Sequence, residues 1–135
     1  MQMIPVRYED SYEGQLRKLV GNPRLILPAA RVIIVDSENN LLLIKRKDNR
    51  KWGFPAGSLE LNEAIMDCAK REVKEETGLD LLSADVLAIY SEPRFQYTND
   101  YGNKIQLITT VFLATAWKGK LVRETNETVD AGFYR

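Results

Sequence analysis

The sequence predicts a mixed α/β sandwich. Three observations support this fold class: the chain is one domain long at 135 residues, one strongly helical segment lies between groups of strand-like segments, and helices and strands do not alternate regularly. A regular alternation would instead predict a parallel, doubly wound sheet. No repeat, low-complexity tract or linker divides the chain, so we expect a single domain over residues 1–135.

The first expected element is a helix near the N-terminus. Asp10 and Glu13 resemble a capping box, and apolar side chains follow at helical spacing. Gly21 and Pro23 then end this helix.

Strands are expected next. Arg31–Asp36 and Leu41–Lys47 are apolar or β-branched runs, and the polar residues 37–40 between them predict a hairpin. Trp52–Gly57 is expected to be a short strand that enters a loop marked by proline and glycine.

The central helix, Glu63–Thr77, has the strongest pattern of any element. Asn62 is the expected N-cap and Gly78 ends the helix. At 100° per residue its apolar side chains form one stripe, which should face the sheet. This stripe consists of Ile65, Cys68, Ala69 and Val73.

The remaining segments are predicted to be strands. We expect them at Val86–Ser91, Arg94–Thr98 and, after a turn over residues 99–103, at Ile105–Trp117. Ala131–Arg135 is expected to be a final strand that is cut off where the sequence ends, which indicates a shortened C-terminal end.

Composition excludes several classes of function. The chain is 44% hydrophobic and 28% charged, which is typical of a soluble globular protein. Nineteen basic and nineteen acidic residues leave no net charge to attract nucleic acid or an anionic membrane. No apolar run is long enough to cross a bilayer, and residues 1–10 lack the apolar block of a secretory signal. We therefore expect a cytoplasmic protein with no nucleic-acid or membrane partner, and a homodimer stays open.

The chain has no histidine and a single cysteine, Cys68. This excludes every catalytic or metal site that needs histidine, every internal disulfide and every zinc site with several cysteines. A lone thiol suits the reducing cytoplasm, and Cys68 is expected to serve only in packing. Any catalysis must therefore rely on carboxylates, together with a metal ion that prefers oxygen ligands.

The apolar stripe of the central helix continues into acidic residues. Glu72 and Glu76 project near the side that should be buried, and Glu75 flanks them. Charges are rarely buried unless they are paired or bind a metal, and neighbouring carboxylates repel one another. Oxygen ligands favour Mg²⁺, Mn²⁺ or Ca²⁺ over zinc or copper. The alternative is an exposed face whose glutamates pair with the basic residues of the same helix.

The segment from Gly57 to Leu79 resembles the Nudix box, G-x5-E-x7-R-E-U-x-E-E-x-G-U, where U is a bulky apolar residue. The matching residues are Gly57, Glu63, Arg71-Glu72-Val73, Glu75-Glu76 and Gly78-Leu79. Seven fixed positions would match by chance at a given start with odds on the order of 10⁻⁹. The chain resembles a Nudix hydrolase from about Leu27 to its end, and residues 1–26 resemble a helical extension that varies within the family.

This resemblance implies a fold and a reaction. The fold would be a Nudix-type α/β/α sandwich with a mixed β-sheet and the box helix packed on it. The reaction would be the hydrolysis of a nucleoside diphosphate linked to another moiety, with Mg²⁺ or Mn²⁺ as cofactor and a small nucleotide as substrate. Nudix folds also serve as non-catalytic nucleotide-binding or regulatory modules, which is the alternative. Such modules usually lose box glutamates, whereas this chain keeps all of them.

The resemblance also implies metal ligands. Glu72, Glu75 and Glu76 would bind the metal through their carboxylates, and Ala56 would contribute its backbone carbonyl. Glu72 would alternatively act as the general base. The family more often has glycine at position 56, but a carbonyl ligand does not depend on the side chain.

Four further box residues would support these ligands. Glu63 and Arg71 resemble residues that orient the metal-binding glutamates, although an ordinary helix salt bridge would explain them equally well. Gly57 and Gly78 would allow the loop bend and the end of the helix.

Outside the box, Arg46 is the candidate for binding substrate phosphates, because arginine binds phosphate through two hydrogen bonds. Its alternative role is an exposed cation at the edge of a hairpin. Phe95, Tyr97 and Tyr101 are candidates for stacking on a nucleobase, although aromatic residues on strands more often pack against neighbouring strands.

The resemblance implies one more acidic residue, located in the loop before a late strand. Glu124, Glu127 and Asp130 are the candidates. Glu127 is preferred because it lies in a polar stretch just before the last strand, and Phe133 follows six positions later. An exposed loop glutamate without a catalytic role is the alternative.

Overall fold

The computed structural model describes residues 7–99 and 101–135. The prediction that residues 1–10 contain no secretory signal lies largely outside the described residues, as does position 100 of the predicted turn at 99–103. The helices are η1 (Tyr8–Asp10), α1 (Tyr12–Val20), α2 (Ile65–Thr77) and η2 (Pro93–Phe95). The strands are β1 (Leu25–Ile33), β2 (Leu41–Arg46), β3 (Trp52–Gly53), β4 (Ala56–Ser58), β5 (Asp80–Tyr90), β6 (Gln96–Thr98), β7 (Lys104–Lys118) and β8 (Thr128–Tyr134).

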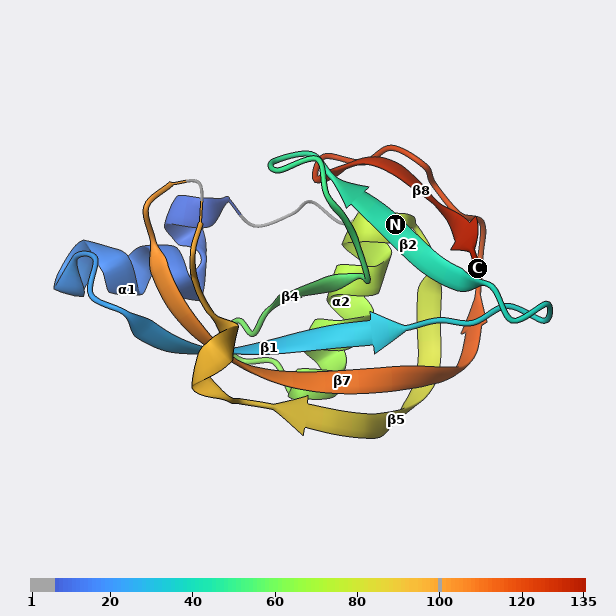
Figure 1. Ribbon diagram of the computed structural model, residues 1–135, viewed down its shortest axis with the longest axis horizontal. Helices are drawn as coiled ribbons and strands as arrows, with labels where there is room; N and C mark the ends of the chain where they lie inside the picture. Colours follow the sequence, from blue (N-terminus) through green and yellow to red (C-terminus); the bar gives the residue numbers. More distant parts are fainter. Residues whose placement is uncertain (1–6, 100) are drawn as a thin grey trace.

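The strands form two sheets (Figure 1). The larger sheet has the order β4-β1-β7-β5, and β6 pairs with the start of β7. Strands β1 and β7 run parallel, whereas β4, β5 and β6 pair antiparallel. The smaller sheet has the order β3-β2-β8 and is antiparallel. The predicted α/β sandwich with a mixed sheet is confirmed.

The core lies between α2 and the larger sheet. The predicted stripe of α2 is confirmed, because Cys68, Ala69 and Val73 are fully buried. Against them pack Val32 of β1 and Phe112 of β7, which are paired neighbours in the sheet. These contacts fix the orientation of α2 and therefore the direction in which its glutamates point.

The caps of both helices differ from the predictions. Ser11, not Asp10, caps α1, because its Oγ accepts a hydrogen bond from the Gly14 backbone N–H at 3.0 Å. Ala64, not Asn62, is the N-cap residue of α2. Asn62 instead has a positive φ of 67° in the preceding turn. Gly78 ends α2 as predicted, in the left-handed conformation that glycine favours.

The predicted hairpin is wrong in part. Its two strands belong to different sheets, and only a single bridge, Val35 to Leu41, joins the segments across the turn. The first strand begins earlier, at Leu25, because nine consecutive residues of β1 pair with β7. The strand predicted at Val86–Ser91 likewise begins at Asp80, directly after α2, since it pairs with the C-terminal half of β7. Pairing with β7 overrides the weak strand preference of the residues at the start of β5.

Helix α1 lies beside the end of the larger sheet where β1 and β7 begin (Figure 1). The Arg17 guanidinium reaches the backbone carbonyl of Lys104 at 2.8 Å and so attaches the helix to β7. No helix in the described part of the chain is long and apolar enough to cross a membrane.

Candidate active site

Glu72 and Glu76 of α2 are buried, as their projection toward the core predicts, and Glu75 on the flank is partly buried. Glu76 is 1% exposed and Glu72 is 7% exposed. The side chain of Glu75 is 4% exposed. The alternative, an exposed face paired with basic residues of the same helix, is wrong about exposure but right that Arg71 pairs with Glu72 and Glu75.

Three carboxylates come together at one end of the box helix. Glu72 and Glu75 from α2 and Glu127 from the loop before β8 each offer an oxygen atom, and these atoms all lie within 4.8 Å of one another. We call these three residues the acidic cluster. Glu76 lies beside it and accepts a hydrogen bond from the Ala56 backbone N–H at 2.8 Å, which ties α2 to strand β4. The structure thus brings the helix glutamates together with Glu127, the loop residue preferred from the sequence.

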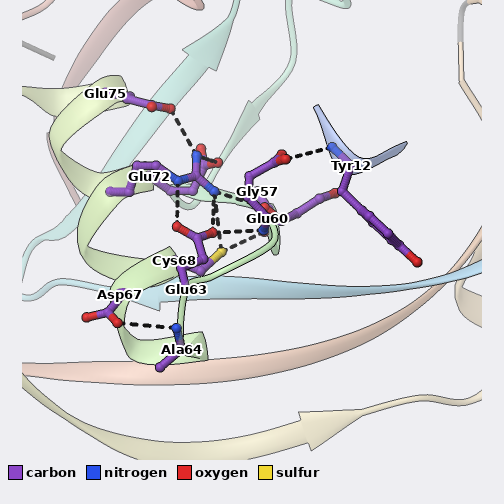
Figure 2. Close-up of polar contacts among 11 residues, drawn as sticks. Tyr12, Gly57, Glu60, Glu63, Ala64, Asp67, Cys68, Glu72 and Glu75 are labelled. Atoms are coloured by element: carbon purple, nitrogen blue, oxygen red, sulfur yellow. Dashed lines mark hydrogen bonds and ion pairs between the residues drawn. The ribbon is translucent and has the colours of Figure 1, made fainter. Parts of the chain in front are cut away.

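Arg71 neutralises much of this charge. Its guanidinium donates to Glu72 Oε1 at 2.6 Å and to Glu75 Oε2 at 3.3 Å. It also donates twice to the Glu63 carboxylate, at 2.8 and 3.0 Å, and to the backbone carbonyl of Ser58 at 3.0 Å. Figure 2 shows Glu63, Glu72 and Glu75 gathered around these contacts. Arg71 thus pairs with three glutamates, two of which are predicted metal ligands.

Burial shifts the titration of the helix glutamates. Desolvation raises the pKa of Glu72 to about 8, although the Arg71 charge acts in the opposite direction. Desolvation together with the Glu72 charge raises the pKa of Glu76 well above its ordinary value. The pKa of Glu75 is also raised, again chiefly by burial. A raised pKa means that the carboxyl group keeps its proton to a higher pH than an ordinary glutamate, and a bound cation favours its ionised form.

Gly57 lies directly against the Glu72 carboxylate. A Cβ atom at position 57 would overlap the carboxylate carbon and both oxygens of Glu72. The φ of Gly57 is not positive, so the predicted need for a special backbone bend is wrong. Glycine is required here because only hydrogen leaves room for the glutamate.

Hydrogen bonds on both sides hold the loop that carries Glu127. The Glu127 carbonyl accepts from the Lys47 N–H at 2.9 Å, and its own N–H donates to Thr125 Oγ1 at 3.2 Å. The fully buried Thr128 contacts the Glu76 carbonyl through its hydroxyl at 3.5 Å. The sequence did not identify the role of these threonines, although their spacing around Glu127 is typical of a hydroxyl-capped turn.

Asp130, one of the two other candidate acids of this loop, pairs with Arg123 at 3.4 Å. Glu124 is exposed. Neither belongs to the acidic cluster.

The predicted substrate-binding residues make contacts of their own, outside the hydrogen bonds of the helix glutamates. Arg46 makes two hydrogen bonds to Asp48, at 2.9 and 3.0 Å, a partner that the sequence analysis missed although it lies only two residues away. Phe95 is 37% exposed and packs edge-on against Tyr90. Tyr97 is half-exposed on β6, and Tyr101 is largely exposed.

Comparison with known proteins identifies relatives of this arrangement. A family model described as the NUDIX domain matches residues 25–135. The chain is 35% identical to an ADP-ribose pyrophosphatase of Methanocaldococcus jannaschii over 65% of this chain and 50% of that protein. It is 28% identical to an 8-oxo-dGTP diphosphatase of Proteus vulgaris over 73% of this chain and 84% of that protein. The chain spans about half the length of the curated relatives that head the comparison, at 45% and 50%.

Solved structures share the fold. A MutT NUDIX hydrolase from Burkholderia pseudomallei superposes with a TM-score of 0.66 and 26% identity, covering 82% of this chain and 83% of that one. A MutT/nudix family protein from Enterococcus faecalis matches 97% of this chain and 56% of its own, with a TM-score of 0.65. At 20% identity, the second match supports the fold alone.

Proposed function

The chain belongs to the NUDIX domain family, and on this premise we propose that it is a metal-dependent pyrophosphohydrolase. Its substrate would be a nucleoside diphosphate linked to another moiety, and water would attack one phosphorus atom. The observation that carries the proposal is the acidic cluster, in which two nearly buried carboxylates meet a third from a loop. Cytoplasmic localisation is part of this proposal, and a homodimer stays a prediction.

The acidic cluster fits a divalent cation. Its three residues offer only carboxylate oxygens, which are the ligands that Mg²⁺ and Mn²⁺ prefer. Burial raises the pKa values of Glu72 and Glu75 despite the Arg71 charge, so a further cation is needed to stabilise their ionised forms. We propose Glu72, Glu75 and Glu76 as metal-binding residues, with the Ala56 carbonyl. When bound, the metal supplies positive charge that offsets the repulsion between a diphosphate and its nucleophile.

The proton transfer and the positioning of the carboxylates are assigned to side chains of the protein itself. Glu127 is the exposed member of the acidic cluster, and we assign to its carboxylate the proton released by the attacking water. Glu72 is the alternative base, although its Oε1 already accepts the short hydrogen bond from Arg71. Arg71 and Glu63 hold the helix carboxylates in place, and Gly57 leaves room for Glu72.

Substrate recognition is proposed outside the helix. Arg46 lies close enough to the site for the charges of Glu76 and Glu127 to raise its pKa, after the larger effect of its hydrogen bonds to Asp48. We propose that Arg46 binds substrate phosphate and that Phe95 or Tyr97 stacks on a base. The relatives act, by their names, on ADP-ribose and 8-oxo-dGTP, and we propose that a small nucleotide of this kind is the substrate.

Chromatographic analysis of the hydrolysis products tests this function, because cleavage of these substrates gives phosphate esters or pyrophosphate and no free phosphate. The purified protein is incubated with ADP-ribose, 8-oxo-dGTP and a dinucleoside polyphosphate, each with Mg²⁺, with Mn²⁺ or with excess EDTA, and Glu72→Gln is the matched control. We expect hydrolysis of at least one compound that needs the metal and falls at least about 100-fold in the variant. Turnover that persists in EDTA would contradict the mechanism. Binding of these nucleotides without any turnover would identify the non-catalytic module instead.

A further inference from the structure

Helix α1 precedes residues 25–135, which match the NUDIX domain. It nevertheless contacts the loop between β4 and α2, residues 59–64, which we call the box loop. The backbone N–H of Tyr12, the first residue of α1, donates to Glu60 Oε1 at 2.7 Å. Ser11 Oγ accepts from another N–H of the first turn, that of Gly14. A carboxylate at the N-terminus of a helix is favoured by the exposed N–H groups and by the helix dipole. Glu60 therefore has a defined electrostatic reason to hold α1.

Glu60 also touches the support of the acidic cluster. Its backbone N–H donates to Glu63 Oε1 at 2.9 Å, and the same Glu63 carboxylate receives two hydrogen bonds from Arg71. Arg71 in turn holds Glu72 and Glu75. Figure 2 shows this continuous path from Tyr12 through Glu60 and Glu63 to the helix glutamates.

The α1 end of this hydrogen-bond path is attached to its surroundings through Arg17. The side chain of Arg17 on α1 is 8% exposed. It donates to the carbonyls of Pro23 and Lys104, at 2.9 and 2.8 Å, and to the side chain of Asn22 at 3.1 Å. Arg17 thus fixes helix α1 to the start of β7, while Tyr12 at the other end of the helix binds Glu60. The helix therefore gives Glu60 a fixed point of attachment.

The loop itself has few other restraints. Leu61 and Asn62 are exposed, and Asn62 has a positive φ, which a non-glycine residue adopts at some cost. Before them, Leu59 N–H donates to the Pro28 carbonyl at 3.0 Å. Between Leu59 and Glu63, the Glu60 side chain provides the hydrogen bond that joins the loop to another element.

We propose that Glu60 is a positioning residue that couples α1 to the Arg71 network and so fixes the acidic cluster. This inference rests on the proposed function only for its effect on catalysis. Through the coupling, the segment before the matched domain becomes part of the machinery that sets the geometry of the site. The coupling acts on the orientation of Glu63 and Arg71, so it affects kcat and metal binding more than the binding of the substrate's organic part.

Three variants of the full chain test the proposal. Glu60→Ala removes the acceptor for the Tyr12 N–H, whereas Glu60→Gln keeps a side-chain oxygen at the same position. Glu38→Ala is the matched control, because Glu38 is an exposed glutamate in the turn between β1 and β2. For each we would measure kcat and KM on the best substrate, Mn²⁺ affinity without substrate, and amide hydrogen exchange of the peptide covering residues 58–64.

We expect Glu60→Ala to lower kcat by about threefold to tenfold, to weaken Mn²⁺ binding and to speed exchange in residues 58–64, with KM nearly unchanged. Glu60→Gln should restore more than half of each loss, and Glu38→Ala should match the wild type. The proposal is overturned if Glu60→Ala leaves exchange and Mn²⁺ affinity at wild-type values, or if Glu60→Gln loses as much as Glu60→Ala.

The two proposals fail separately. If the wild type hydrolyses none of the nucleotides, the proposed function fails, but exchange and Mn²⁺ binding still decide the role of Glu60. If the wild type is active and Glu60→Ala behaves like it in every readout, the coupling fails while the function stands.

Discussion

The acidic cluster joins two regions that hold their carboxylates in different ways. On α2, Glu72 and Glu75 are nearly buried, share the Arg71 guanidinium and have raised pKa values. In the loop before β8, Glu127 is exposed and is held through its backbone. The helix places charge where water does not stabilise it, so it depends on cations. The loop keeps its carboxylate solvated and adds it to the site at little cost in folding stability.

The largest expected effect is on the helix side, where one substitution should lower activity without lowering stability. Glu76→Gln removes a buried charge but keeps an oxygen to accept the hydrogen bond from the Ala56 N–H. We expect activity to fall by about 10²–10⁴-fold, because a ligand charge is lost. The melting temperature of the metal-free protein should stay level or rise, because the amide is neutral at every pH whereas a buried carboxyl group opposes folding when it ionises. Differential scanning fluorimetry in EDTA checks this point, and a clear fall would identify Glu76 as a structural partner instead.

A smaller effect is expected on the loop side. Glu127→Gln should lower kcat by at least about tenfold with little change in stability, because Glu127 is solvated in the absence of metal. Glu124→Gln is the matched control, three residues earlier and outside the cluster. Steady-state kinetics of both variants measure the difference. Equal, near-wild-type rates would show that the helix glutamates complete the site without the loop.

The smallest effect is a pH dependence that arises chiefly on the helix side, from the burial of Glu72. The folded pKa of Glu72 is about 8, against an ordinary value of 4.5, so the folded state holds a proton that the unfolded state releases. The stability gained in this way is complete below pH 4.5 and is lost as the pH rises toward 8. Thermal unfolding of the metal-free protein should therefore show a melting temperature that falls between pH 5 and pH 8.

Two controls sharpen this pH prediction. The fall should be much smaller in Glu72→Gln, which removes the titrating group, and only slightly smaller in Glu127→Gln, which removes a lesser charge that also raises the pKa of Glu72. A melting temperature that rises from pH 5 to pH 8 in the wild type would contradict the idea that buried, unneutralised carboxylates oppose folding.

The sequence predicted the helix side better than the loop side, for a physical reason. Regular helical spacing converts residue numbers into directions, so the burial of Glu72 and Glu76 could be predicted without knowledge of the rest of the fold. Nothing in the spacing reveals that Gly57 must leave room for Glu72, or that Arg71 reaches Glu63, because these contacts join separate segments.

Long-range contacts also explain the errors in the fold. The start of β5 at Asp80 and the separation of β1 from β2 are set by pairing with β7 and β8, which lie far away in the sequence. The Tyr12 to Glu60 hydrogen bond spans 48 residues and uses a backbone donor that no side-chain motif marks. Glu127 was chosen from its loop position and by resemblance, and its meeting with α2 became visible only in three dimensions.

Direct measurement of Mn²⁺ binding tests the central claim that the acidic cluster is a divalent-cation site. Isothermal titration calorimetry at pH 7.5, without nucleotide, compares the wild type with Glu72→Gln and with the exposed control Glu38→Ala. We predict saturable binding in the wild type and the control, with proton release as the raised-pKa carboxyls ionise, and at least about tenfold weaker binding in Glu72→Gln. Equal Mn²⁺ affinity in all three proteins, or no binding in the wild type, would contradict the claim.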